Sequence, residues 1–113
     1  MEAVRTIVRA LLREPFPGRD ALEVQLERCA IIQRGTREHP AFVFQVEGDV
    51  PRAFVVARVP SEATQSDTDG TTIHVLLHVV SGRLHLLEIY REDGEAPSGR
   101  LDPERLELFI PPA

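Results

Sequence analysis

Three of the four histidines fall within residues 74–85, and imidazole is the side chain best suited to ligate a metal or move a proton near neutral pH. A turn signal, Ser81-Gly82, separates His74 and His78 from His85, and a two-residue loop there would place His78 opposite His85. Local spacing fixes no third ligand beside these two rings. We therefore expect no metal and no other cofactor, and interpret the histidines as part of a face that solvent or a partner covers.

Glu88 is the second candidate for chemistry. The strand alternation predicts it on an otherwise apolar face, where desolvation would raise its pKa and make it a general acid or base beside Tyr90. An ion pair with an arginine explains the same residue more simply. The sequence contains no glycine-rich phosphate loop, no G-x-S-x-G, H-E-x-x-H or C-x-x-C motif, and no lysine for a Schiff base. Enzymatic activity thus stays open, and the balance favours a non-enzymatic role.

These residues belong to a hairpin predicted over residues 72–91. A two-residue loop would pair Leu76 with Leu87 and His74 with Ile89. A loop of three residues would shift this pairing by one, and that alternative remains open. In the first register, one face is a predicted core consisting of Ile73, Val75, Leu77, Val79, Leu84, Leu86 and Tyr90, interrupted by Glu88. The other face is a mixed surface and the predicted binding site, consisting of His74, His78, His85, Arg83, Arg91, Leu76, Leu87 and Ile89.

Two helices are predicted before the hairpin. In residues 2–13 the apolar positions Val4, Ile7, Val8 and Leu11 follow the helical period, which indicates an amphipathic helix. The prolines and glycine of residues 15–18 then break the chain. A second helix is expected through about residue 28, with Asp20 as its N-cap and Glu23 completing a capping box.

The remaining strands follow from alternation and from β-branched or aromatic residues. Strands are expected near residues 30–32, 42–46, 54–59 and 106–110. The polar residues 61–71 predict either a long hairpin tip or a mobile loop, in which Asp67, Asp69 and Gly70 form a turn and not a calcium site. Helices followed by a run of strands predict an α+β fold: two N-terminal helices on one face of an antiparallel meander of about five strands.

Length and composition bound the class of protein. With 113 residues and no biased linker, residues 1–113 are expected to form a single domain. The net charge of −5, with no basic block, argues against nucleic acid as a partner, and the short apolar runs argue against a membrane. The lone Cys29 excludes an internal disulfide and is expected in the core, and the lack of a secretory pattern favours the cytoplasm.

The stretch from His74 to Glu95, with Phe16-Pro17-Gly18-Arg19-Asp20 upstream, resembles a group of uncharacterised small proteins from Streptomyces and related actinobacteria. The match covers about a quarter of the chain directly. It agrees with the lack of lysine and asparagine, which is typical of a GC-rich bacterial genome, and implies no activity. More distantly, the chain is similar to the cystatin-like and NTF2-like architecture of a helix and a curved sheet, which implies a fold and no function.

For function, we expect an interaction module that binds a protein partner or a second copy of itself through the mixed face of the hairpin, with an immunity or antitoxin-like protein as one form. The alternative is a small-ligand pocket or enzyme between the helices and the sheet, with Glu88 and Tyr90 among its polar groups.

Overall fold

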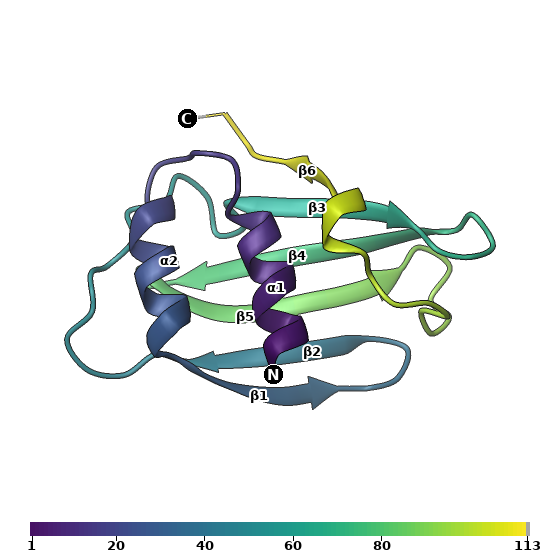
Figure 1. The fold of residues 1–113 in the computed structure, drawn as a ribbon, viewed down its shortest axis with the longest axis horizontal. Helices are drawn as coiled ribbons and strands as arrows, with labels where there is room; N and C mark the ends of the chain where they lie inside the picture. Colours follow the sequence, from purple (N-terminus) through teal and green to yellow (C-terminus); the bar gives the residue numbers. More distant parts are fainter. Residues whose placement is uncertain (113) are drawn as a thin grey trace.

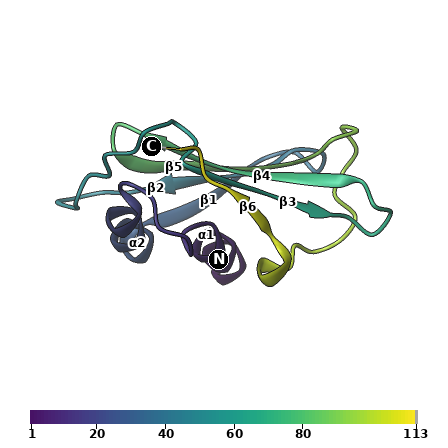
Figure 2. The ribbon, with the colours of Figure 1, turned by 90° about the horizontal axis from the view of Figure 1, so that it is seen from above.

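Both helices pack on one face of a six-stranded antiparallel sheet in the computed structural model, which describes residues 1–112 (Figure 1 and Figure 2). The helices are α1 (Glu2–Leu11) and α2 (Arg19–Arg28). The strands are β1 (Ala30–Gly35), β2 (Pro40–Gln45), β3 (Ser61–Ser66), β4 (Thr72–Val80), β5 (Arg83–Arg91) and β6 (Glu107–Phe109), the last preceded by a short 3-10 helix, η1 (Pro103–Arg105). The predicted α+β class is confirmed, with six strands in place of about five. Neither α1 nor α2 reaches the length and apolarity of a bilayer-spanning helix, a statement that covers residues 1–112.

The strand order is β1-β2-β5-β4-β3-β6, so the sheet is not a simple meander. The hairpin of β1 and β2 joins the hairpin of β4 and β5 through the antiparallel pair β2 and β5. After β2, residues 46–60 cross one end of the sheet, and β3 then begins on the far side of β4 (Figure 1). The last strand, β6, pairs with β3 at that edge.

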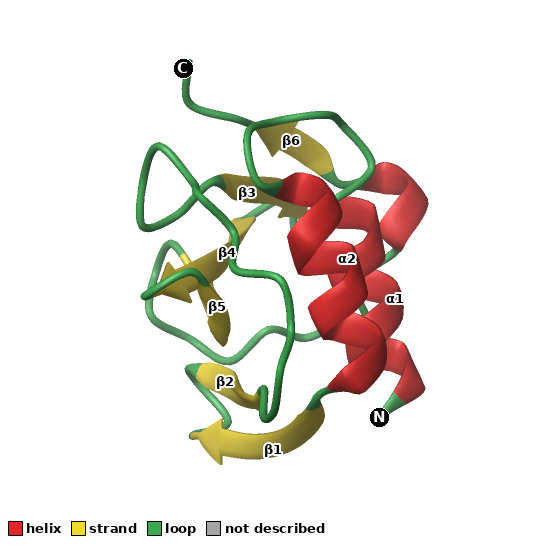
Figure 3. Ribbon diagram, turned by 90° about the vertical axis from the view of Figure 1, so that its left-hand side faces the viewer, coloured by secondary structure: helices red, strands yellow, loops and turns green. Residues whose placement is uncertain are grey.

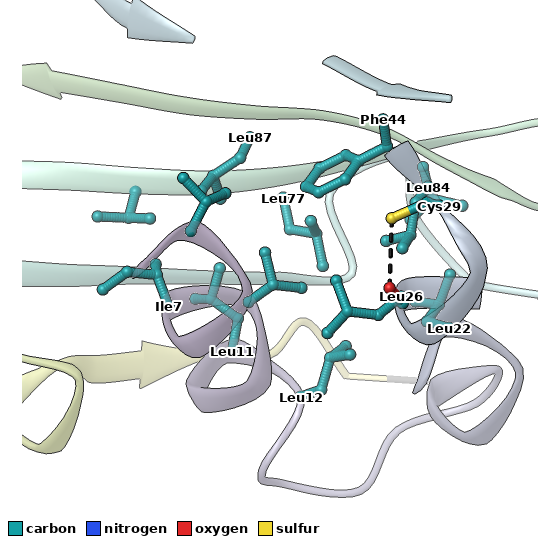
Figure 4. Packing of buried hydrophobic residues seen from close by; sticks show 14 of the residues in the cluster. Ile7, Leu11, Leu12, Leu22, Leu26, Cys29, Phe44, Leu77, Leu84 and Leu87 are labelled. Atoms are coloured by element: carbon teal, nitrogen blue, oxygen red, sulfur yellow. Dashed lines mark hydrogen bonds between the residues drawn. The ribbon is translucent and has the colours of Figure 1, made fainter. Parts of the chain in front are cut away.

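The core lies between the helices and the face of the sheet that they cover. Figure 3 shows both helices on that one side of the strands. The predicted stripe of α1 is confirmed, because Val4, Ile7, Val8 and Leu11 are all buried. They pack with apolar side chains of α2 and of the central strands, among them Leu22, Leu26, Leu77, Leu84 and Leu87 (Figure 4). Cys29 is buried in this cluster as expected, and its thiol donates to the Leu26 carbonyl at 3.4 Å.

The start of α2 differs from the predicted capping box. Gly18 is the N-cap, with a φ of 93°, and no side chain caps the helix. Asp20 lies within the first turn, where its carboxylate accepts from Arg19 Nε at 2.8 Å. A Cβ on residue 18 would lie 3.0 Å from Val55 Cγ1, so the left-handed glycine also lets residues 53–55 approach. The helix therefore begins after a left-handed glycine and not after a capping side chain. The prediction of Asp20 as the N-cap is wrong.

The predicted strand at 54–59 is wrong, and the predicted loop at 61–71 is wrong over residues 61–66, which form β3. Residues 51–60 form no strand, and Phe54 is 87% exposed. Strand β3 begins only after Pro60, although its residues Ser61, Ala63 and Gln65 are small or polar. Their buried polar groups are satisfied, since Ser61 Oγ donates to the Leu11 carbonyl at 2.7 Å and Gln65 exchanges two hydrogen bonds with the Asp102 backbone. Tertiary hydrogen bonds thus override β-propensity here.

Gln25 of α2 fixes the end of the central hairpin. It is fully buried, donates to the Gly82 and Pro51 carbonyls, and accepts from Leu84 N at 2.8 Å. The predicted two-residue loop is confirmed, with Val80 opposite Arg83 and positive φ at both Ser81 (52°) and Gly82 (73°). The helix layer therefore holds the turn from which the register of β4 and β5 begins.

Candidate functional site

A β-bulge in β5 decides which side chains reach each face of the sheet. Val79 pairs with Leu84 and His78 pairs with Leu86, so His85 is an extra residue without a partner on β4. From this point the predicted register is wrong by one residue. His78 is not opposite His85, which is exposed at the bulge.

The bulge moves Leu86, Glu88 and Tyr90 from the predicted core face to the face that carries no helix. We call this helix-free surface the open face. Side chains of five strands and of the terminal β6 lie on it in three rows that run across the sheet. The first row is Ile32, Val43, Leu86 and His78; the second is Arg34, Ala41, Glu88, Leu76, Glu62 and Phe109; the third is Tyr90, His74, Thr64 and Glu107.

Glu88 is the centre of the polar part of the open face. Its carboxylate accepts from His39 Nε2 at 2.6 Å and from His78 Nε2 at 2.8 Å. Arg58 Nε donates to the other ring nitrogen of His78, Nδ1, at 3.4 Å. With Nδ1 accepting and Nε2 donating, this arrangement matches the neutral Nε2–H tautomer of His78. The carboxylate therefore orients two imidazoles from elements that are far apart in sequence.

The pKa of Glu88 is lowered, contrary to the expectation that burial would raise it. Partial burial acts in the predicted direction, but the hydrogen bonds from His78 and His39 outweigh it. Glu88 is thus an ionised acceptor and not a protonated general acid.

His74 and Tyr90 form the neighbouring contact of the third row. Their rings stack with centroids 4.9 Å apart and an interplanar angle of 14°, and the His39 ring lies 5.5 Å from Tyr90. His74 Nε2 is hydrogen-bonded to Glu92 Oε1 at 3.0 Å. Three histidines therefore gather on the open face, but His39 takes the place predicted for His85.

The arrangement of these rings does not suit a metal. Each Nε2 atom of His39, His74 and His78 is directed at a carboxylate oxygen. Within residues 1–112, no group of three or more His, Cys, Asp or Glu side chains is placed to hold an ion. What the cluster offers a ligand is an ionised carboxylate, imidazole edges and an aromatic ring.

Arg91 lies in a second ionic cluster, and its predicted place on the mixed face is wrong. Its side chain is only 7% exposed and pairs with Asp67, Asp69 and Asp93 at 3.0, 3.0 and 2.5 Å. Asp67 also accepts from the backbone N–H groups of Thr68, Ser98 and Gly99. Hydrogen bonds, first of all from Ser98 N–H, hold the pKa of Asp67 far below its usual range, so the aspartate is charged. The cluster confirms the predicted turn at residues 67–70.

Three further residues of the predicted binding set lie elsewhere. Leu87 and Ile89 are buried on the helix side of the sheet. Arg83 donates to the carbonyls of Val46 and Gly48, which holds the loop after β2. Of that set, the open face keeps His74, His78 and Leu76.

Sequence reasoning missed two members of the site. His39 is 49 positions from Glu88 and reaches it only because β2 pairs with β5. Arg58 comes from the segment that was predicted as a strand. The sequence held one sign of the bulge. Without a bulge, Glu88 would be the single charged residue on an apolar face, and a one-residue bulge shifts it to the other face.

The space between the helix side and the sheet is lined by residues other than those predicted. A hollow of about 890 Å³ lies there, between α1, the strands β2 and β5, and residues 97–103. Glu88 and Tyr90 do not line it, because both point to the open face. The polar groups assigned to that pocket are therefore a wrong prediction.

Comparison of the chain with known protein families, with curated proteins and with solved structures finds no match. The resemblance to actinobacterial proteins and to the cystatin-like and NTF2-like architecture stays a prediction.

Proposed function

We propose that this chain is a non-enzymatic interaction module that binds a basic protein partner through the open face of its sheet. The carrying observation is that this face combines a row of aliphatic side chains with carboxylates and is covered by no helix (Figure 2). An extended apolar surface rimmed by polar groups is typical of protein interaction sites.

The apolar part of the surface is the first row of the open face. Ile32, Val43 and Leu86 are cross-strand neighbours on three adjacent strands, and each is only partly buried. Leu76 continues the apolar strip from the second row. A partner that covers this strip removes apolar area from water, at about 25 cal/mol per Å².

Charge favours a basic partner over a second copy. The open face and its rim carry Glu62, Glu88, Glu92 and Glu107 against Arg34 and Arg58. Arg83, opposite Val80 near the turn, adds a third guanidinium, which the carbonyls of Val46 and Gly48 hold. A two-fold dimer would place the same acidic patch against itself, which like charges oppose. A partner rich in arginine or lysine would instead meet ionised carboxylates, and an antitoxin-like or immunity-like role is one form of this function.

The proposal is tested with a photo-crosslinking amino acid in place of Leu86, introduced into the chain in its own host cells. We expect adducts with a basic protein, identified by mass spectrometry, and their loss when Glu62→Arg is added. The matched control carries the crosslinker at Val24, an exposed residue of α2 on the other side of the molecule.

Two outcomes contradict the proposal. Adducts of the same proteins from both positions would show that the open face has no special role. Crosslinks between two copies of the chain, with a dimer mass in light scattering, would replace the basic partner by self-association.

A further inference from the structure

The hollow on the helix side has a different composition from the open face. We propose that this hollow, between α1, β2, β5 and residues 97–103, is a second binding site. Its ligand would be a single-chain amphiphile with an anionic head group, such as a long-chain carboxylate. The volume of the hollow, about 890 Å³, is within the range of small-molecule sites. The site goes beyond the proposed function and shares no residue with the open face.

The floor of this groove is apolar. Phe42 of β2 and Leu87 and Ile89 of β5 face it from the sheet, and Ile7 of α1 and Leu101 form its sides. In Figure 1, the segment after β5 returns beside α1 and opposite the hairpin of β1 and β2, so the groove is bounded by elements from both ends of the chain. Such a channel suits an alkyl chain, which gains stability in proportion to the apolar area that it buries.

Two arginines give the groove its charge. Arg37, between β1 and β2, and Arg100, in the segment after β5, both line it, and no aspartate or glutamate does. Neither guanidinium forms an ion pair or donates a hydrogen bond to another residue among residues 1–112, which is also true of Arg28 and Arg105 outside the groove. By contrast, Arg5, Arg9, Arg13, Arg19, Arg83 and Arg91 all do. In a chain of net charge −5, a groove whose charged lining residues are both cations is complementary to an anion.

The backbone around the groove argues for an amphiphile and against an extended peptide. Strand β2 is paired on both sides, by β1 and β5, and β5 is paired by β2 and β4. The N–H groups of Ser98 and Gly99 are taken by Asp67. A peptide lying on the floor formed by β2 and β5 would find no strand edge to extend there, since the free edges of the sheet belong to β1 and β6; adding a strand to such an edge is how extended peptides usually gain affinity. Apolar contact and two guanidinium groups remain, and these match an alkyl chain with an anionic head.

The test is a titration of ¹⁵N-labelled protein with dodecanoate below its critical micelle concentration, followed by NMR. We expect saturable shifts at Ala3, Thr6 and Gln33, which line the groove, and none in the first row of the open face. The double variant Arg37→Gln/Arg100→Gln should bind dodecanoate about tenfold more weakly, because two exposed charge contacts are lost. The matched control Arg28→Gln/Arg52→Gln removes the same charge outside the groove and should leave the affinity unchanged.

A second variant tests the apolar part without altering charge. Ala3 is exposed at the start of α1 and lines the groove, so Ala3→Trp should fill it and weaken dodecanoate binding at least as much, while the fold is retained. The proposal is overturned by no saturable shifts, by shifts centred on the open face, or by dodecyltrimethylammonium binding as tightly as dodecanoate. None of these results bears on the proposed partner site, which the crosslinking experiment probes separately.

Discussion

Strand β5 carries two ionic clusters three residues apart, and they are opposites in composition and in exposure. On the helix side, the Arg91 cation lies among three carboxylates, and the side chains of Arg91 and Asp67 are 7% and 1% exposed. On the open face, the Glu88 carboxylate lies between two imidazoles and is 25% exposed. One strand thus presents a closed ionic contact to the protein interior and an open one to solvent.

The difference separates a structural role from a binding role. The Arg91 cluster joins the end of β5 to residues 67–71 and 93–99, and its hydrogen-bonding groups are used within the chain. In the Glu88 cluster, His39 is half-exposed and can exchange its contact for one with a partner. Removing a closed contact should therefore affect folding, whereas removing an open one should mainly affect recognition.

Acid should produce the largest effect, because the pKa values of Asp67, Asp69, Asp93 and Glu88 are all lowered by their partners. Between the folded and the unfolded pKa, the unfolded chain binds more protons, so the free energy of unfolding falls as the pH falls. This stabilisation is complete above about pH 5 and is lost progressively below about pH 4. Urea unfolding from pH 7 to pH 2 measures it.

The variant Asp67→Asn shows which cluster causes that loss. At neutral pH it should raise the unfolding equilibrium constant roughly a hundredfold, because it removes one partner of a buried ion pair. The difference from wild type should narrow as the pH falls from about 4 to 2, because the unfolded wild-type chain then binds a proton at Asp67 that the folded chain does not bind. Parallel acid profiles for the two proteins would show that Asp67 does not contribute to the acid sensitivity.

Glu88→Gln should have a smaller effect, an increase in the unfolding constant of about fivefold. A glutamine can accept from only one of the two imidazole N–H groups and turns its own N–H toward the other. The matched control is Glu92→Gln, which breaks the contact of His74 with a carboxylate that is 63% exposed and should change the constant by less than about twofold. Equal effects of the two variants in urea unfolding would contradict the expectation that the less exposed carboxylate contributes more to stability.

The sequence predicts the fold class and much of the core because apolar periodicity is strong in α1 and β4. The burial of Val4, Ile7, Val8 and Leu11, and of alternate residues along β4, follows directly from that periodicity. The periodicity does not predict that residues before Pro60 form a loop and that residues after it form a strand. Residues 54–59 have strong β-propensity, but β3 gains Ser61 and Gln65 contacts to Leu11 and Asp102, which lie 50 and 37 positions away.

The candidate site is less predictable because it depends on one bulge and on one long-range pairing. The residue types on the hairpin correctly indicate a face rich in histidine, but a shift of one residue reassigns Leu87, Ile89 and Glu88 between faces. His39 enters the cluster only through the pairing of β2 with β5, for which the sequence has no local signal.

The bulge at His85 also has a consequence for tolerance of length changes in this protein. Because His85 has no partner on β4, deleting it would join Leu84 and Leu86 in an uninterrupted ladder. Every other side chain of β5 would keep its present face, whereas loss of a residue away from the bulge, such as Ile89, would invert part of the strand. We therefore expect β5 to hold a dispensable residue close to its turn, and amide chemical shifts of a His85 deletion should match wild type from Leu87 onward.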